Sequence, residues 1–133
     1  AINHVEQVLE GRQPMTDFAR DVSTFCGGDR HGVMAWVSAA TQAAYAQLAP
    51  LIIKHADTAD FARGVLVEAG KEVAKIGDAL DPTGKLPIAL CGGLGEPLRP
   101  HLPAALLARI ILPQADSAAG ALILIRHRLQ GKR

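Results

Sequence analysis

The chain has 133 residues, of which 49% are hydrophobic, and its 14 basic and 13 acidic side chains leave a formal net charge of +1. This length suits one domain with a real hydrophobic core. The charge balance excludes a strongly basic surface of the kind that binds nucleic acid or a membrane. The longest basic cluster has no aromatic platform beside it and is interpreted as the solvated last turn of a helix. Its members are Arg126, His127, Arg128, Lys132 and Arg133.

Cys26 and Cys91 lie far apart, with no CxxC pair and no Cys/His spacing typical of a metal site. We therefore expect two free, buried thiols in a reducing, cytoplasmic setting. No apolar run reaches the length of a membrane span, and no stretch reads as a secretory signal. The five histidines are scattered without ligand spacing, so no metal site is predicted.

Apolar residues at helical spacing predict that the first 80 residues are mainly helical. Thr16 is expected to cap a helix over Asp17–Phe25 whose buried face carries Phe18, Val22 and Phe25. The other predicted helices cover residues 2–10, 31–47 and 51–55, and a long one opens at Asp60. The buried stripe expected on that last helix is Phe61, Val65, Ala69, Val73, Ile76 and Leu80.

The pattern then changes. Leu86–Cys91 is a continuous apolar run bounded by turn residues, which predicts a parallel strand buried on both faces. A glycine turn, a helix near Leu98–Ala108, a short strand at Ile110–Leu112 and a helix over Ala118–Gln130 are expected to follow. The predicted fold is mainly α with a small parallel sheet, divided into a helical region, 1–85, and a strand–glycine–helix–strand–helix element, 86–133. Two strands are a marginal sheet, so a free strand edge could pair with a second copy, and a homodimer is predicted.

The glycine turn, Gly92-Gly93-Leu94-Gly95, follows the buried strand directly. Glycines let the backbone turn sharply and approach a ligand closely, and ligands of open α/β sheets lie beyond the carboxyl ends of strands. The turn lacks the Gly-Lys-Ser/Thr of a P-loop, and Pro97 stands where a dinucleotide fingerprint requires a third glycine. A tight structural turn remains an alternative interpretation of these glycines.

Three segments in order, Leu86–Gly95, Leu98–Leu102 and Asp116–Leu122, resemble the C-terminal end of sugar kinases in the actin-like ATPase superfamily. The likeness is closest to the glucosamine and N-acetylglucosamine kinases of the BadF/BadG/BcrA/BcrD-type ATPase family. Upstream, Ala35–Ala40 and Leu48–Leu51 resemble the helical insert of those kinases. The resemblance extends over nearly the whole chain.

The resemblance implies an incomplete C-terminal ribonuclease-H-like domain that forms the adenosine side of an ATP-dependent amino-sugar kinase. In that family an aspartate of the first domain acts as base while the γ-phosphoryl group of Mg-ATP passes to a sugar hydroxyl. By this carry-over, Gly92, Gly93 and Leu94 contact the nucleotide, and Gly95 and Glu96 lie at the rim. ATP, Mg²⁺ and glucosamine or N-acetylglucosamine are the ligands expected of the full-length parent.

The family's phosphate loops, catalytic aspartate and sugar pocket have no counterpart in this sequence. We therefore expect no kinase activity from the chain alone, and its start at Ala1 without methionine suggests a piece of a longer protein. The aspartates at turns and helix ends are interpreted as structural. Two alternatives stay open: an activator ATPase of acyl-CoA dehydratases or reductases with an iron–sulfur cluster, and a helical interaction module without catalysis.

Overall fold

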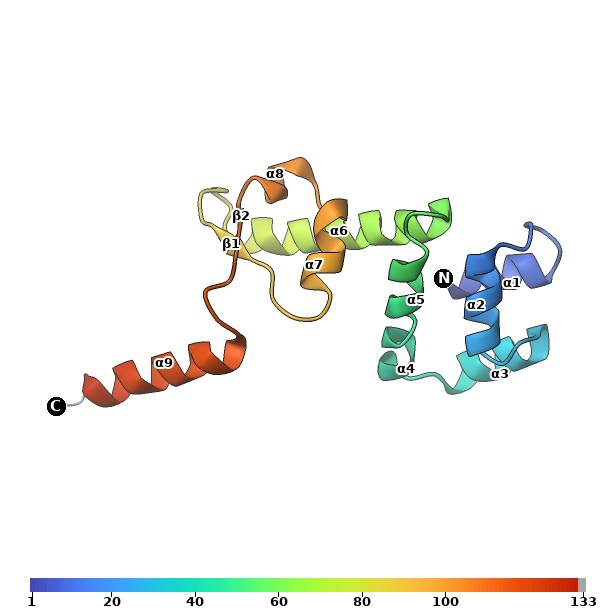
Figure 1. Ribbon diagram of the computed structural model, residues 1–133, viewed down its shortest axis with the longest axis horizontal. Helices are drawn as coiled ribbons and strands as arrows, with labels where there is room; N and C mark the ends of the chain where they lie inside the picture. The colour runs from blue at the N-terminus through green and yellow to red at the C-terminus, as the bar shows by residue number, and fades with distance from the viewer. Residues whose placement is uncertain (132–133) are drawn as a thin grey trace. The chain divides into compact units, whose positions relative to one another are not determined.

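The structure, a computed structural model, describes residues 1–131 and divides into two compact units, Ala1–Ala69 and Gly70–Arg133 (Figure 1). The division falls inside the longest helix, α6 (Asp60–Leu80). The predicted boundary at residue 85 stays a prediction. Lys132 and Arg133 of the predicted basic cluster lie outside the described residues.

The first unit is built from helices alone. Its elements are α1 (Ile2–Leu9), α2 (Asp17–Phe25), α3 (Arg30–Ala39), α4 (Gln42–Ala46), α5 (Ala49–Lys54) and the first part of α6. The helix predicted over Asp17–Phe25 is confirmed with its cap, since Thr16 Oγ1 accepts a hydrogen bond of 3.1 Å from the Ala19 amide. Such a bond satisfies one of the free amides of a first helical turn.

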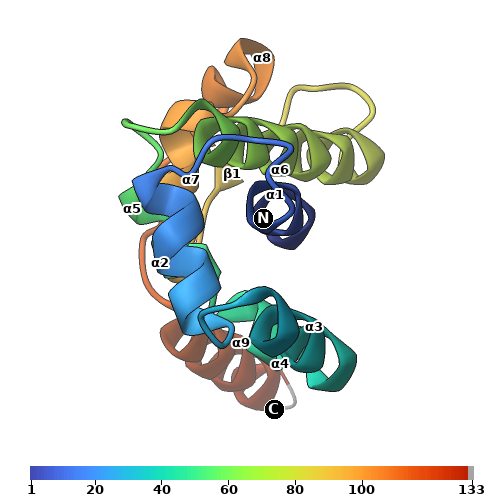
Figure 2. The ribbon, with the colours of Figure 1, turned by 90° about the vertical axis from the view of Figure 1, so that its right-hand side faces the viewer.

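The core of this unit forms where α1 packs against α2. Figure 2 shows α1 almost end-on. Val5, Phe18 and Val22 are fully buried there. The predicted apolar face of α2 is thus confirmed for Phe18 and Val22. It is wrong for Phe25, which is 41% exposed and contacts Trp36 edge to face instead.

The single helix predicted over residues 31–47 is wrong, because α3 and α4 are separate helices. Ala40 adopts an extended backbone with φ −70° and ψ 129°, which ends α3. Thr41 then caps α4 by accepting a hydrogen bond from the Ala44 amide. The apolar spacing runs through this break, so periodicity alone conceals it, whereas the local hydrogen bond of the threonine decides it.

The second unit contains the sheet. Its elements are the rest of α6, β1 (Ile88–Ala89), α7 (Gly95–Leu98), the 3₁₀ turn η1 (Arg99–His101), α8 (Ala104–Leu107), β2 (Ile110–Ile111) and α9 (Ser117–Gln130). The strands pair in parallel, with Ile88 opposite Ile110 and Ala89 opposite Ile111. The predicted fold class is confirmed at this level: mainly helix, with a small parallel sheet.

Three predicted elements of this unit are shorter than expected, and one of them, the strand predicted at Ile110–Leu112, ends at Ile111. Of the run Leu86–Cys91, only Ile88 and Ala89 pair with another strand, and burial on both faces is wrong, since Leu86 is 60% exposed. The helix expected near Leu98–Ala108 is divided into α7, η1 and α8. Pro100 and Pro103 lack the amide hydrogen that a continuous helix needs, and a proline disfavours helical backbone in the residue before it.

The stripe predicted as the buried face of α6 is also wrong. The buried positions are Ala62, Leu66 and Gly70, whereas Ile76 is 60% and Leu80 is 80% exposed. The true face is displaced by one residue from the predicted one, which corresponds to a rotation of roughly 100° about the helix axis. Apolar residues occur on more than one side of α6, so the packing partners select the buried side.

The last helix, α9, agrees with the helix predicted over Ala118–Gln130 and begins one residue earlier, at Ser117. Asp116 caps it, because its Oδ1 accepts a hydrogen bond of 2.8 Å from the Ala119 amide. Arg126, His127 and Arg128 are exposed near its end. Among residues 1–131, no helix combines the length and apolar character that crossing a bilayer requires.

Candidate functional site

The glycine turn follows β1 and changes the chain direction within four residues. Gly92 has φ +89°, a left-handed conformation that side chains with a Cβ rarely adopt. The Gly95 amide donates to the Gly92 carbonyl oxygen at 3.1 Å, which closes the turn. A Cβ at Gly92 or Gly93 would meet no atom within 4 Å, so the backbone of both residues faces open space. A ligand can therefore lie directly against this backbone.

Gly95 has a different role in the same turn. It is buried, and a Cβ at this position would lie 3.3 Å from the carbonyl carbon and from the Cβ of Leu90. The first residue of α7 thus lies against the end of the strand segment that precedes the turn. Because α7 has only 4 residues, backbone access, and not a helix dipole, is what the turn offers a ligand.

The other two predicted site residues border the turn. Leu94 is 55% exposed, and the Glu96 carboxylate lies 3.8 Å from the Arg99 guanidinium in an exposed ion pair. The structure therefore brings Gly92–Glu96 together as one continuous, mostly exposed surface.

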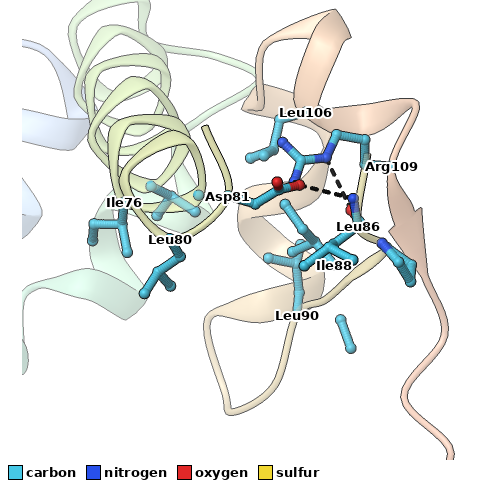
Figure 3. A pocket seen from close by; sticks show the side chains of 12 residues that line it. Ile76, Leu80, Asp81, Leu86, Ile88, Leu90, Leu106 and Arg109 are labelled. Carbon is cyan, nitrogen blue, oxygen red and sulfur yellow. Dashed lines mark hydrogen bonds and ion pairs between the residues drawn. The ribbon is translucent and has the colours of Figure 1, made fainter. Parts of the chain in front are cut away.

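An apolar hollow of about 360 Å³ lies in the same unit, between α6, β1 and α8 (Figure 3). Its walls are mainly aliphatic, and the Asp81–Arg109 ion pair borders it. Leu90 lines it, whereas none of the predicted residues Gly92–Glu96 does. The hollow and the glycine turn are therefore adjacent along the chain but are separate surfaces.

Sequence reasoning missed Arg109. Its Nη2 donates to Asp81 Oδ2 at 2.8 Å, and the two side chains are only 13% and 9% exposed. Asp81 is one of the aspartates interpreted as structural because they lie at turns and helix ends, and its contacts agree: its Oδ1 accepts from the Thr83 amide and hydroxyl. A signal for Arg109 was present: it is a lone charge in the apolar stretch from Leu106 to Leu112.

Hydrogen bonds from Thr83 and Leu86, together with the Arg109 charge, lower the pKa of Asp81 below its ordinary value of 3.8. The donors stabilise the carboxylate more than the protonated acid. These contacts favour the charged form of Asp81, which suits a structural anchor.

The prediction of two buried thiols is half right. Cys26 is buried, and this burial raises the pKa of its thiol, whereas Cys91 is exposed immediately before the glycine turn. Within residues 1–131, no group of three or more His, Cys, Asp or Glu side chains could hold a metal ion. The exposed cysteine instead provides a natural chemical probe next to the candidate site.

Another hollow, of about 570 Å³, lies in the first unit. It is next to the stacked rings of His4 and Phe61, whose centroids lie 4.2 Å apart. His55 borders it, and its Nε2 lies 2.8 Å from Asp21 Oδ2. Lys54 first, and then His55, lower the pKa of Asp21 by hydrogen bonding. Lys54, His55 and Asp21 thus serve as one another's hydrogen-bond partners, and this cluster gives no indication of a substrate.

A comparison with solved structures identifies a protein that the whole chain resembles. A crystal structure from Chromobacterium violaceum, described as that of a "Putative N-acetylglucosamine Kinase", matches 92% of this chain with 43% sequence identity and a TM-score of 0.84. The resemblance to the N-acetylglucosamine kinase branch is confirmed. The match covers 43% of the length of that protein. No protein-family model and no curated protein matches the chain.

Proposed function

We propose that this chain supplies the adenosine-side element of an ATP-dependent kinase that phosphorylates an amino sugar, N-acetylglucosamine or glucosamine. The observation that carries the proposal is the exposed glycine turn in a chain that shares 43% identity with the Chromobacterium violaceum protein. In this account Gly92 and Gly93 lie against the nucleotide through their bare backbone. Leu94 covers one side of it and Glu96 forms the rim, while Gly95, also predicted at the rim, is buried against Leu90 and supports the turn from behind.

The proposed fold is the C-terminal ribonuclease-H-like domain of an actin-like ATPase. A parallel strand leads into the turn, as expected for ligands that bind beyond the carboxyl ends of strands. Phosphoryl transfer depends mostly on positioning and on stabilisation of charge, so an element that binds adenosine contributes by orientation. Such an element has no need of a catalytic side chain of its own.

The residues of the glycine turn fit contact with ATP but not the binding of Mg²⁺. The open backbone at Gly92 and Gly93 fits the close approach of a nucleotide. Magnesium prefers several oxygen ligands, and Glu96, the one carboxylate of the turn, pairs with Arg99. We therefore assign no magnesium ligand to this chain, and the proposed catalytic base and sugar pocket are likewise assigned to other residues of a whole kinase.

Cys91 offers a test that needs no added label. The rate at which an alkylating reagent modifies Cys91 is measured by mass spectrometry with and without Mg-ATP, because this thiol is exposed directly before Gly92. The proposal predicts saturable protection of Cys91 by Mg-ATP. A Gly93→Val variant is the control, since its side chain occupies the space above the backbone and should abolish protection.

Turnover is measured in the same samples with N-acetylglucosamine and glucosamine as acceptors. The expected result is nucleotide binding without sustained sugar phosphorylation. Absence of both protection and direct ATP binding would contradict the proposed nucleotide contact, and sustained turnover would contradict the assignment of the catalytic groups to other residues.

A further inference from the structure

Leu86, two residues before β1, is held by its backbone on both sides. Its amide donates to Asp81 Oδ2 at 2.8 Å, and its carbonyl oxygen accepts from Arg109 Nε at 3.0 Å. The same Arg109 side chain also donates through Nη2 to Asp81 Oδ2. Figure 3 shows Asp81 and Arg109 side by side, next to Leu86. One carboxylate and one guanidinium thus form a closed set of hydrogen bonds around a single peptide segment.

The two charged residues lie just outside a helix and a strand that pack beside β1. Asp81 directly follows α6, and Arg109 directly precedes β2. The Ile88 amide also donates to the Arg109 carbonyl oxygen, at 2.9 Å. The contacts of Asp81 and Arg109 therefore fix where β1 begins relative to both α6 and β2. With only two residue pairs in the ladder, the sheet itself fixes this register weakly.

A continuous set of contacts leads from this point to the glycine turn. Ile88 and Leu90 lie on the same side of the extended segment, because side chains alternate along a strand. Leu90 in turn lies against Gly95, where a Cβ would come within 3.3 Å of it. A shift of β1 along β2 would therefore displace the strand end and the residues Gly92–Glu96 together.

We propose that Asp81 and Arg109 are positioning residues for the nucleotide-facing turn: they set the register of β1 and, through Leu90 and Gly95, the placement of Gly92–Glu96. This inference rests on the proposed function of the turn. It adds that the affinity for nucleotide depends on a pair that does not touch the nucleotide.

A purely stabilising role is the competing explanation. Buried ion pairs are weak evidence for stability, since desolvation offsets much of their attraction. The chain offers a matched arginine that separates the two roles. Like Arg109, Arg63 joins backbone oxygen to a carboxylate: it binds the carbonyl oxygens of Ala56 and Asp57 and pairs with Asp60. It is more exposed than Arg109, and all its contacts lie within residues 56–63.

The experiment compares Arg109→Lys with Arg63→Lys in the full chain. Lysine keeps the positive charge but cannot reproduce the forked contact of a guanidinium. Affinity for Mg-ATP, urea unfolding and amide NMR spectra are measured for each variant. We expect Arg109→Lys to weaken Mg-ATP binding about tenfold and to shift the amide signals of Ile88 and Gly92–Gly95, whereas Arg63→Lys changes the affinity less than about twofold.

Three results would overturn the inference. They are an unchanged affinity in a folded Arg109→Lys chain, an equal loss of affinity in Arg63→Lys, and signals of Gly92–Gly95 that do not move in Arg109→Lys. If the wild-type chain does not bind Mg-ATP, the proposed function fails, and the amide signals still decide whether the pair positions the turn. If Arg109→Lys does not fold, Asp81→Asn replaces it in the comparison. The amide signals of Ile88 and Gly92–Gly95 are then expected to shift in the same way.

Discussion

The backbone of α6 touches the carbonyl group of His101 at Gly70. A Cβ at position 70 would overlap the His101 carbonyl oxygen and lie 3.0 Å from its carbon. Only a residue without a side chain allows the helix to come this close to η1. This contact helps to fix α6 against the segment that follows the glycine turn.

Gly70→Ala is therefore expected to destabilise the chain. Alanine normally stabilises a helix interior relative to glycine by up to about 1 kcal/mol, but here the added methyl group forces backbone atoms apart, which costs about 1–3 kcal/mol. The measurement is the free energy of unfolding in urea. Gly64→Ala is the matched control in the same helix, where a Cβ meets no atom within 4 Å and alanine should stabilise. Equal effects at the two positions would refute the close contact.

Gly92→Ala and Gly93→Val should separate folding from binding. Gly92 has φ +89°, so a side chain there adds backbone strain of about 1–2 kcal/mol. Gly93 has no such constraint and faces open space, so valine should change the free energy of unfolding by less than about 0.5 kcal/mol. Both variants should lose Mg-ATP affinity, measured by calorimetry. A folded Gly93→Val chain that binds Mg-ATP as the wild type does would argue against backbone contact.

Acid should weaken the fold partly through Asp81. Its folded pKa is lowered, mainly by Thr83 and also by Leu86 and Arg109, so its contribution is present above the unfolded value and is lost as the pH falls through the folded value. We expect the unfolding free energy to decrease less steeply below about pH 4 in Asp81→Asn than in the wild type. Exposed Asp57→Asn is the control and should keep the wild-type slope. Parallel curves for all three chains would contradict this role of Asp81.

The two cysteines should react at different rates. Cys91 is exposed, whereas Cys26 is buried and its thiol pKa is raised by desolvation. Thiolate is the reactive form, so Cys26 is protected both by burial and by protonation. A thiol reagent at pH 8 should modify one cysteine in the native chain and both in denaturant, as counted by intact mass. Rapid modification of both in the native chain would show that the first unit opens easily.

Local chemistry explains which parts of the fold could be predicted from the sequence. The helices capped by Thr16 and Asp116 follow from side chains that bond to amides three residues away, so nearby residues suffice. The glycine turn is equally local, because Gly92 needs a conformation that its own lack of a Cβ permits.

The failures concern long-range packing. The buried face of α6 was predicted one residue away from Ala62 and Leu66, because the choice among several apolar faces depends on other elements. The hydrogen bonds of Arg109 with Asp81 and Leu86 join residues 28 and 23 positions apart. No local pattern encodes such a pairing, although a lone arginine in an apolar stretch gives a hint that it has a buried partner.

Nucleotide contact at the glycine turn is the central claim, and amide NMR tests it most directly. The ¹⁵N-labelled chain is titrated with Mg-ATP, and the signals of Gly92, Gly93, Leu94, Gly95 and Glu96 are followed beside those of exposed Gly11 and Gly28 in the first unit. The account predicts saturable shifts at the five turn residues and none at the two reference glycines. Saturable shifts elsewhere in the chain, with the turn unchanged, would contradict it.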